Sequence, residues 1–336
     1  MKRDDPRDTV VDAKKTRLGV AAISSDPRDA DLSGTMFGGY LVDREIGGGA
    51  MGIVYRASHI DTNRVVALKT LRAQLMEEPT TVARFKREAR IASRLGHPHI
   101  GGVIELVEAQ DRYALALELV EGEPLTTLMT MPMSAERVLP IVGQLLRGLE
   151  HAHAMGLVHR DLKPANVLVE WRNDRDHVRI IDFGIAIVRD GGPETSERLT
   201  GAGMIVGTPD YMAPEQASGG EIDHRADLYA LGIMMYEMIA GTLPFEGKPP
   251  DVLAARMKRE VPAIAEVAPA LIVDPLIERF IRKLLARKVD KRFENARAAL
   301  TVLGLLQTDR GAAGAMLGVM DVETALALIS LPQPPR

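Results

Sequence analysis

The stretch EIGGGAMGIVYRA, residues 45–57, places Gly47, Gly49 and Gly52 directly before a run of branched and aromatic residues. Their GxGxxG spacing allows a backbone to approach phosphate oxygens closely. In a dinucleotide-binding domain such a loop leads into a helix, whereas residues 53–60, IVYRASHI, have a strand pattern. The Lys and Ser or Thr that end a Walker A loop are also missing. The glycines alone fit either a phosphate-binding hairpin or a simple tight turn.

Strand-like runs surround this loop. Short, β-branched segments separated by turn signals predict antiparallel strands at 40–46, 53–59, 64–71, 100–109 and 113–122. Between the third and fourth runs, apolar residues recur at helical spacing, and Gly96 ends a predicted helix at 80–96. The first part of the fold is therefore predicted to be mostly sheet with one helix.

Helical patterns dominate after Gly122. Apolar periodicity predicts helices at 134–156, 225–241, 250–260, 274–286 and 294–307. A sheet-rich lobe therefore precedes a helix-rich lobe, which is an α+β organisation. Residues 1–36 mix both charge signs without periodicity and are predicted to be a disordered leader. Residues 308–336 are predicted to be a short accessory tail, and its Ala, Leu and Met content favours a cap on the helical lobe over a partner site.

Composition limits the function classes. The chain has 336 residues, a formal net charge of −4 and no cysteine. Disulfides and thiolate metal sites are excluded, and the charge is not that of a nucleic-acid-binding protein. No signal peptide and no apolar run of membrane-spanning length is evident. We therefore expect a cytoplasmic protein with no nucleic-acid partner and no membrane segment.

Four further motifs follow the loop in order. VALK ends at Lys69, HRDLKPANVL spans 159–168, DFG spans 182–184 and APE spans 213–215. Together with the glycine loop they resemble the protein-kinase signature set. HRDLKPANVL and GTPDYMAPEQ are similar to those of bacterial Ser/Thr kinases of the eukaryotic (Hanks) type. The resemblance implies a bilobal kinase domain over 40–306, with an N-lobe at 40–119 and a C-lobe at 123–306.

The resemblance also implies roles for individual residues. Phosphoryl transfer depends on positioning and on neutralising charge rather than on covalent work by the protein. Lys69 matches the lysine that pairs the α- and β-phosphates of ATP, and Glu88 matches its ion-pair partner. Asp161 matches the base that accepts the substrate hydroxyl proton, beside Lys163 and Thr208. Asn166 and Asp182 match the ligands of Mg²⁺, an ion that favours hard oxygen donors.

A nucleotide slot is implied as well. Adenine needs an apolar cleft with backbone hydrogen-bond partners. The hinge residues Glu118 and Val120 match those that meet the adenine edge, and Leu117 matches the gatekeeper. The remaining ATP-contacting positions implied by the resemblance are Ile46, Gly47, Gly48, Gly49, Ala50, Met51, Gly52, Ile53, Val54, Ala67 and Leu168. The apolar members also suit plain core packing.

Regulation is predicted in the segment from DFG to APE. Arg160 precedes Asp161, as in kinases that are switched by phosphorylation in this segment. Thr200 is the best-placed acceptor, with Thr195 and Ser196 as alternatives, and a phosphate there gains charge-assisted hydrogen bonds to arginine. A kinase dimer is the arrangement expected for autophosphorylation. Three scaffold residues are also implied: a Glu215–Arg292 ion pair, and Asp227 bracing the catalytic loop.

Two close histidine pairs invite a metal interpretation. His97 with His99, and His151 with His153, each lack a third ligand at a fitting spacing. We therefore expect packing or surface roles for them.

The resulting prediction is an ATP- and Mg²⁺-dependent kinase that phosphorylates Ser and Thr hydroxyls of proteins. A pseudokinase scaffold is the main alternative, and the presence of Lys69, Glu88, Asp161, Asn166 and Asp182 weighs against it. A small-molecule kinase of the same fold is the second alternative. The complete GTPDYMAPE segment at 207–215 disfavours it, because in protein kinases that segment shapes a peptide-binding ledge.

Overall fold

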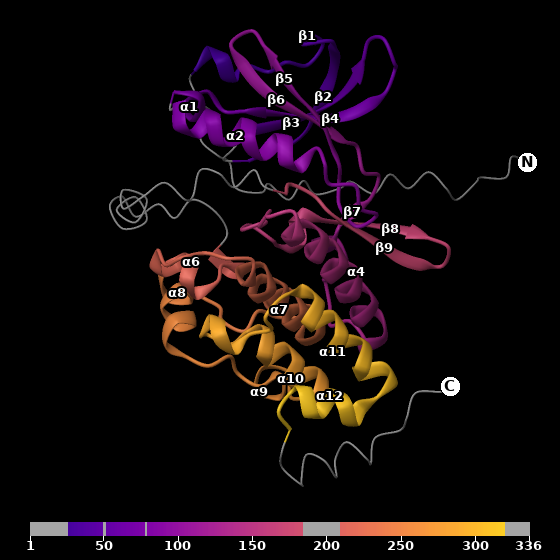
Figure 1. The fold of residues 1–336 in the computed structure, drawn as a ribbon, viewed down its shortest axis with the longest axis vertical. Coiled ribbons are helices and arrows are strands. Elements are labelled where there is room, and N and C mark those ends of the chain that lie inside the picture. The colour runs from indigo at the N-terminus through magenta and orange to yellow at the C-terminus, as the bar shows by residue number, and fades with distance from the viewer. Residues whose placement is uncertain (1–25, 50–51, 78, 184–208, 320–336) are drawn as a thin grey trace, which may run out of the picture.

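The computed structural model describes residues 26–49, 52–77, 79–183 and 209–319, which form two lobes stacked along the long axis of the molecule (Figure 1). The N-lobe is built on an antiparallel sheet in the order β1-β2-β3-β4-β6-β5. Its strands are β1 Met36–Phe37, β2 Tyr40–Gly49, β3 Gly52–His59, β4 Val65–Leu71, β5 Val103–Ala109 and β6 Arg112–Glu118. The helices α1 Ala73–Met76 and α2 Pro79–Ala92 cover one face of this sheet (Figure 1).

Alternation along the strands produces two small cores, one on each face of the sheet. In β4, Val66 and Leu68 are fully buried on the face away from α2. Leu71 packs instead with Phe85 of α2 and Leu115 of β6. Lys69 is two residues from Leu71, so it projects to the α2 side of the strand. The strand therefore directs this lysine toward the space between the lobes.

The end of the leader is part of the N-lobe. Pro27–Asp29 forms the 3₁₀ turn η1, and Leu32 is only 6% exposed in the core that contains Tyr55. The prediction of disorder up to residue 36 is therefore wrong for residues 26–36. The apolar side chain of Leu32 buries against the sheet, a long-range contact that the local composition does not reveal.

The C-lobe is helical, as predicted, and carries a small sheet at the junction between the lobes. Its helices are α3 Leu125–Leu128, α4 Ala135–Ala154, α6 Pro214–Ser218, α7 Arg225–Ala240, α8 Pro249–Lys258, α9 Ile264–Val267, α10 Pro275–Leu284, α11 Ala296–Thr308 and α12 Arg310–Met316. The strands β7 Glu123–Pro124, β8 Val167–Arg172 and β9 Arg175–Ile180 pair in that order, and short 3₁₀ turns are η2 Pro164–Asn166, η4 Pro209–Tyr211 and η5 Val289–Lys291. β8 and β9 pair as an antiparallel hairpin between the HRD and DFG motifs.

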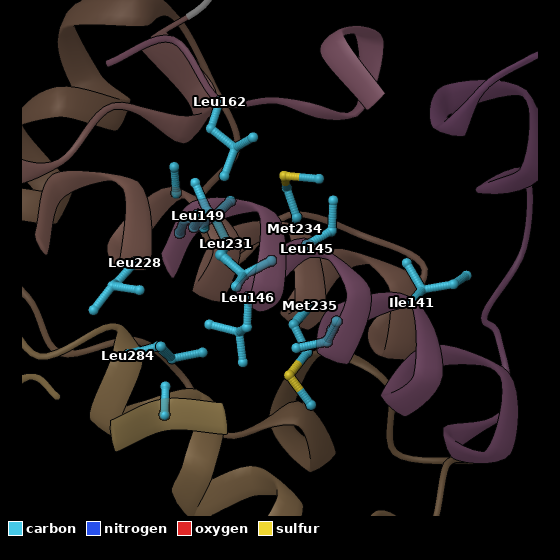
Figure 2. Packing of buried hydrophobic residues seen from close by; sticks show 14 of the residues in the cluster. Ile141, Leu145, Leu146, Leu149, Leu162, Leu228, Leu231, Met234, Met235 and Leu284 are labelled. Carbon is cyan, nitrogen blue, oxygen red and sulfur yellow. The ribbon is translucent and has the colours of Figure 1, made fainter. Parts of the chain in front are cut away.

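The large core of the C-lobe lies between α4 and α7. Figure 2 shows Leu145 and Leu149 of α4 facing Leu231 and Met234 of α7, and all four side chains are fully buried. Most of α7 is enclosed, since both its apolar and its small residues are buried. The catalytic loop residue Leu162 joins the same core (Figure 2). A rigid helical base therefore supports the loop that carries Asp161.

The described part of the tail packs on the helical lobe. The guanidinium of Arg310 in α12 contacts the carboxylate of Asp274 at 2.6 and 3.0 Å, at the start of α10. Ala313 of α12 is buried in the main core. For residues 308–319 these contacts agree with a cap on the lobe. None of the helices in the described ranges combines the length and the apolar composition that a bilayer crossing requires.

Candidate active site

Lys69 and Asp182 meet between the lobes. The ammonium Nζ of Lys69 lies 2.9 Å from the Oδ2 atom of Asp182, and their side chains are 11% and 27% exposed. Lys69 comes from β4, and Asp182 follows two residues after the end of β9. Asp182 has a φ of 66°, a conformation that non-glycine residues rarely adopt and that clusters at functional sites. The fold thus brings together two residues 113 positions apart (182 − 69) in the sequence.

The catalytic loop gathers three more of the predicted residues. Lys163 Nζ donates to Asp161 Oδ2 at 2.8 Å. The amide nitrogen of Asn166 donates to the backbone oxygen of Asp161 at 2.7 Å. This bond orients the amide so that its carbonyl oxygen points away from that backbone. The backbone N–H of Ile181 donates to the backbone carbonyl of Asn166 at 2.9 Å and joins this loop to Asp182.

Asp227, in the first turn of α7, fixes the loop from beneath. Its carboxylate is 1% exposed and accepts hydrogen bonds of 2.8 Å from the backbone N–H groups of His159 and Arg160. His153 Nε2 lies 2.8 Å from the same carboxylate. Burial acts to raise the pKa of Asp227, but the His153 and His159 contacts outweigh it and hold that pKa below its usual value. Arg160 has a φ of 63°, so the buried carboxylate holds a strained turn beside Asp161.

The glycine loop is a hairpin, as the strand pattern after it indicates. Gly47 pairs with Val54 and Gly49 pairs with Gly52 across β2 and β3. A Cβ atom on Gly52 would lie 1.7 Å from the backbone oxygen of Thr70, so only glycine fits there. Ala50 and Met51, at the tip of the loop, fall outside the described residues. The loop therefore turns back into a strand and does not begin a helix.

The residues predicted to contact adenine lie on the strands beside this hairpin and on β8. The strand register sets Val54 opposite Lys69, and Ala67 opposite Leu117. Val54, Ala67, Leu117 and Leu168 are all partly buried, as residues that line a cleft are, while Ile46 is 42% exposed. Residues from both lobes thus keep some exposure at the interlobe edge.

Glu118, a predicted hinge residue, has a partner that sequence reasoning missed. Arg179 of β9 donates Nη1 to Glu118 Oε1 at 2.7 Å, and its Nη2 contacts Glu118 Oε2 and the backbone oxygen of Ile100. The hydrogen bonds from Arg179 lower the pKa of Glu118. The only sequence signal is an arginine between the apolar residues Val178 and Ile180 of the strand.

A second missed residue is Arg256 of α8. It is 1% exposed, and its Nη1 donates to the backbone oxygens of Pro209 at 2.5 Å and Met212 at 2.9 Å. Its Nη2 contacts the backbone oxygen of Asp210. A buried charge that satisfies three carbonyls fixes the segment entering α6. Helical periodicity gives no sign of this role, because arginine in a helix is usually solvated.

The predicted Glu215–Arg292 ion pair is present. The two guanidinium nitrogens lie 2.6 and 2.7 Å from the two carboxylate oxygens, and the side chains are 9% and 0% exposed. Glu215 is the second residue of α6, and Arg292 directly follows η5. This pair therefore anchors the end of the APE motif to the helical lobe.

Several of the predicted contacts stay predictions. Glu88 lies half-buried on α2. Lys69 contacts the carboxylate of Asp182, and the Lys69–Glu88 ion pair stays a prediction. Thr208 and the acceptors Thr195, Ser196 and Thr200 lie outside the described residues.

The histidines have packing contacts. The rings of His97 and His151 stack with centroids 5.2 Å apart, and His99 lies 5.4 Å from His97. Burial, followed by the neighbouring histidines, lowers the pKa of His97 to about 4. Across the described ranges there is no group of three or more His, Cys, Asp or Glu residues arranged to hold a metal.

Comparisons with known proteins agree with this geometry. The family model described as "Protein kinase domain" matches residues 40–302. The Serine/threonine-protein kinase pkn3 of Myxococcus xanthus is 40% identical over 276 residues, which is 81% of this chain and 50% of that protein. Pkn1 of the same organism is 39% identical over 271 residues, covering 80% of this chain and 38% of that protein. The chain thus spans half or less of the length of these two relatives.

A solved structure matches as well. The PknI kinase domain of Mycobacterium tuberculosis superposes with a TM-score of 0.63 and 30% identity, covering 82% of this chain and 99% of that one. The expected α+β, bilobal architecture is therefore confirmed. With the family model matching most of the chain, this protein belongs to the protein kinase family.

Proposed function

We propose that this chain is a serine/threonine protein kinase that transfers the γ-phosphoryl group of ATP to Ser and Thr hydroxyls of proteins. The observation that carries the proposal is the convergence of Asp161, Lys163 and Asn166 within hydrogen-bonding distance. The pair formed by Lys69 and Asp182 lies at the same interlobe site. The names of the relatives, all Ser/Thr kinases, support the acceptor class.

Asp161 acts as the base in this proposal. Its carboxylate accepts the proton of the substrate hydroxyl as the hydroxyl oxygen forms a bond to the γ-phosphorus and the β–γ bridging bond breaks. ADP leaves with the electrons of that bond. Lys163, at 2.8 Å from Asp161, places a cation beside the transferring group. Asp227 holds the loop backbone in place, so the base is pre-positioned before the substrate arrives.

The donor set fits Mg²⁺. Asn166 and Asp182 offer an amide oxygen and a carboxylate, both hard ligands, and Mg²⁺ commonly takes only one or two protein ligands with phosphates and waters completing its shell. The ion would neutralise charge on the nucleotide phosphates. Lys69 contributes a further positive charge at this place. Its contact with Asp182 keeps that ammonium in the interlobe space.

The nucleotide site extends from the glycine hairpin to the hinge. Glu118 and Val120 supply backbone groups for the adenine edge, and Arg179 steadies the hinge through Glu118. We further assign the kinase domain to 40–306, a range supported by the family match, and a cytoplasmic location. Autophosphorylation at Thr200, in a dimer of kinase domains, completes the proposal.

The molecule that receives the phosphate label from ATP distinguishes this function from its alternatives. Purified chain is incubated with labelled ATP, Mg²⁺ and a generic protein substrate, beside Asp161→Asn and the control Asp61→Asn in an exposed turn. We expect label on Ser and Thr of protein with wild type and Asp61→Asn only. Equal label with Asp161→Asn contradicts the catalytic role, and label on a small metabolite alone favours the small-molecule kinase. Mass spectrometry of the same reaction tests Thr200.

A further inference from the structure

The end of the leader contacts the segment that joins β4, which carries Lys69, to α2, which carries Glu88. Residues 26–35, here called the clasp, include the turn η1 and the buried Leu32, whose N–H donates to the Tyr55 hydroxyl at 3.4 Å. The backbone N–H of Val42 donates to the Thr35 carbonyl at 2.9 Å, which closes the clasp onto β2. The C-terminal part of the clasp is therefore hydrogen-bonded to the sheet. Its N-terminal part contacts α1.

Asp29 is the central residue of the clasp. Its side chain is 4% exposed, and Oδ1 accepts a 2.9 Å hydrogen bond from the N–H of Ala73, the first residue of α1. A carboxylate at a helix start satisfies an N–H that has no partner within the helix and interacts favourably with the helix dipole. α1 ends at Met76 and α2 begins at Pro79, so Asp29 binds the first residue of the short helix that precedes the Glu88 helix in the sequence.

The other end of α1 is held by Arg28. Its guanidinium lies 3.0 Å from Glu77, the residue that follows α1, and 2.6 Å from Asp26 within the clasp. Arg28 is 41% exposed, so this contact adds little by itself. Its importance is geometric, because the clasp touches both ends of the same short helix.

Arg72 links the clasp to the glycine hairpin. Oδ2 of Asp29 is buried and lies 3.8 Å from Nη1 of Arg72. The second nitrogen of Arg72, Nη2, donates to the backbone oxygen of Gly49 at 3.4 Å. Arg72 is 17% exposed and stands three residues after Lys69. A continuous set of contacts therefore runs from the leader through Arg72 to the loop proposed to cover the ATP phosphates.

We propose that the clasp is a positioning element of the nucleotide site and that Asp29 is its positioning residue. The proposal rests on the ATP site proposed above. Asp29 holds the side chain of Arg72 in position, and Arg72 in turn contacts the glycine hairpin. Asp29 also holds the start of α1, and we propose that this affects the position of α2. Residues along such contact chains change coupling between sites by about 0.5–2 kcal/mol, which is roughly a 2- to 30-fold change in an equilibrium constant.

Three variants test the clasp. Asp29→Ala removes both contacts, and Asp29→Asn keeps an oxygen for the Ala73 N–H while removing the charge that faces Arg72. Asp31→Asn is the matched control, because Asp31 is exposed and its hydrogen bonds to the described part of the chain go to Ser33 in its own turn. The measurements are KM for ATP, kcat on a protein substrate, the dissociation constant of Mg-ADP, and the melting temperature.

We expect Asp29→Ala to raise KM for ATP and the Mg-ADP dissociation constant by about 2- to 30-fold, with kcat at saturating ATP within about twofold of wild type. Asp29→Asn should lie between wild type and Asp29→Ala, and Asp31→Asn should match wild type. A lower melting temperature with unchanged nucleotide constants overturns the proposal, since it indicates a purely structural role. If Asp29→Ala does not fold, Asp29→Asn alone decides.

Failure of the clasp is distinguishable from failure of the proposed function. A wild-type chain that neither binds Mg-ADP nor transfers label from ATP overturns the proposed function and the clasp with it. If the wild type is active but the Asp29 variants have the same KM for ATP as Asp31→Asn, the proposal for the clasp is overturned and the proposed function stands.

Discussion

Replacing the buried carboxylate of Asp227 tests whether the C-lobe core positions the catalytic loop. Asp227→Ala leaves two backbone donors, the N–H groups of His159 and Arg160, without the acceptor that now lies at 2.8 Å from each. An unsatisfied buried donor costs about 1–3 kcal/mol, so the free energy of unfolding should fall by about 2–6 kcal/mol. Asp227→Asn keeps one acceptor oxygen, and we expect a loss of about 1–3 kcal/mol for it.

Urea denaturation and steady-state kinetics measure this together. The control is Asp223→Asn, which lies just before α7 and whose carboxylate, 37% exposed, pairs with Arg225. We expect the control to cost less than about 1 kcal/mol. We expect kcat of Asp227→Asn to fall by up to about 100-fold, because a 1 Å misplacement near the chemistry has effects of that size. Equal stability and equal kcat for Asp227→Asn and Asp223→Asn would refute the reasoning.

The same carboxylate makes a pH prediction. The pKa of Asp227 is held below its usual value of 3.8, despite burial, by the contacts from His153 and His159. A depressed pKa in the folded state stabilises above the unfolded pKa and stops doing so as pH falls through the folded value. The stability difference between wild type and Asp227→Asn should therefore not narrow from pH 7 to pH 5, and it should narrow only below about pH 3.8. A gap that closes between pH 7 and pH 5 contradicts this.

Two further substitutions test the hairpin and the ion pair. Gly52→Ala places a Cβ atom 1.7 Å from the Thr70 oxygen, so the free energy of unfolding measured with urea should fall by about 1–3 kcal/mol. Gly47→Ala, which has open space around its Cβ, should lower it less. Equal losses argue against the close approach at Gly52. Glu215→Gln leaves the guanidinium of Arg292 buried without the carboxylate that balances its charge, and we expect a loss of about 3–5 kcal/mol; a loss below about 1 kcal/mol shows that the pair is not an anchor.

Local patterns predicted the elements well because strands and helices are local features. The strand after the glycine loop indicated a hairpin rather than a helix, and the register of Gly47 with Val54 has that form. The motif order also predicted which residues approach the interlobe space, such as Lys69 and Asp182. Their exact pairing depends on the backbone turn at Asp182, which no local pattern specifies.

Long-range polar contacts escaped prediction for a physical reason. Arg256, Arg179 and Asp29 are charged residues that local statistics place on the surface. Each side chain is instead buried or partly buried, because a distant group provides a partner, as the Pro209 carbonyl does for Arg256. The predicted boundary of the leader was wrong for the same reason, because Leu32 packs against residues of the sheet that are distant in sequence.

The turnover of Asp161→Asn tests the central claim most directly. A positioned general base typically contributes about 10²–10⁴-fold to the rate. With saturating ATP and Mg²⁺ and one protein substrate, kcat for Ser and Thr phosphorylation should fall at least about 100-fold in Asp161→Asn, while the dissociation constant of Mg-ADP stays close to that of wild type. A variant that phosphorylates protein at the wild-type rate would contradict the assignment of Asp161, and with it the proposed mechanism.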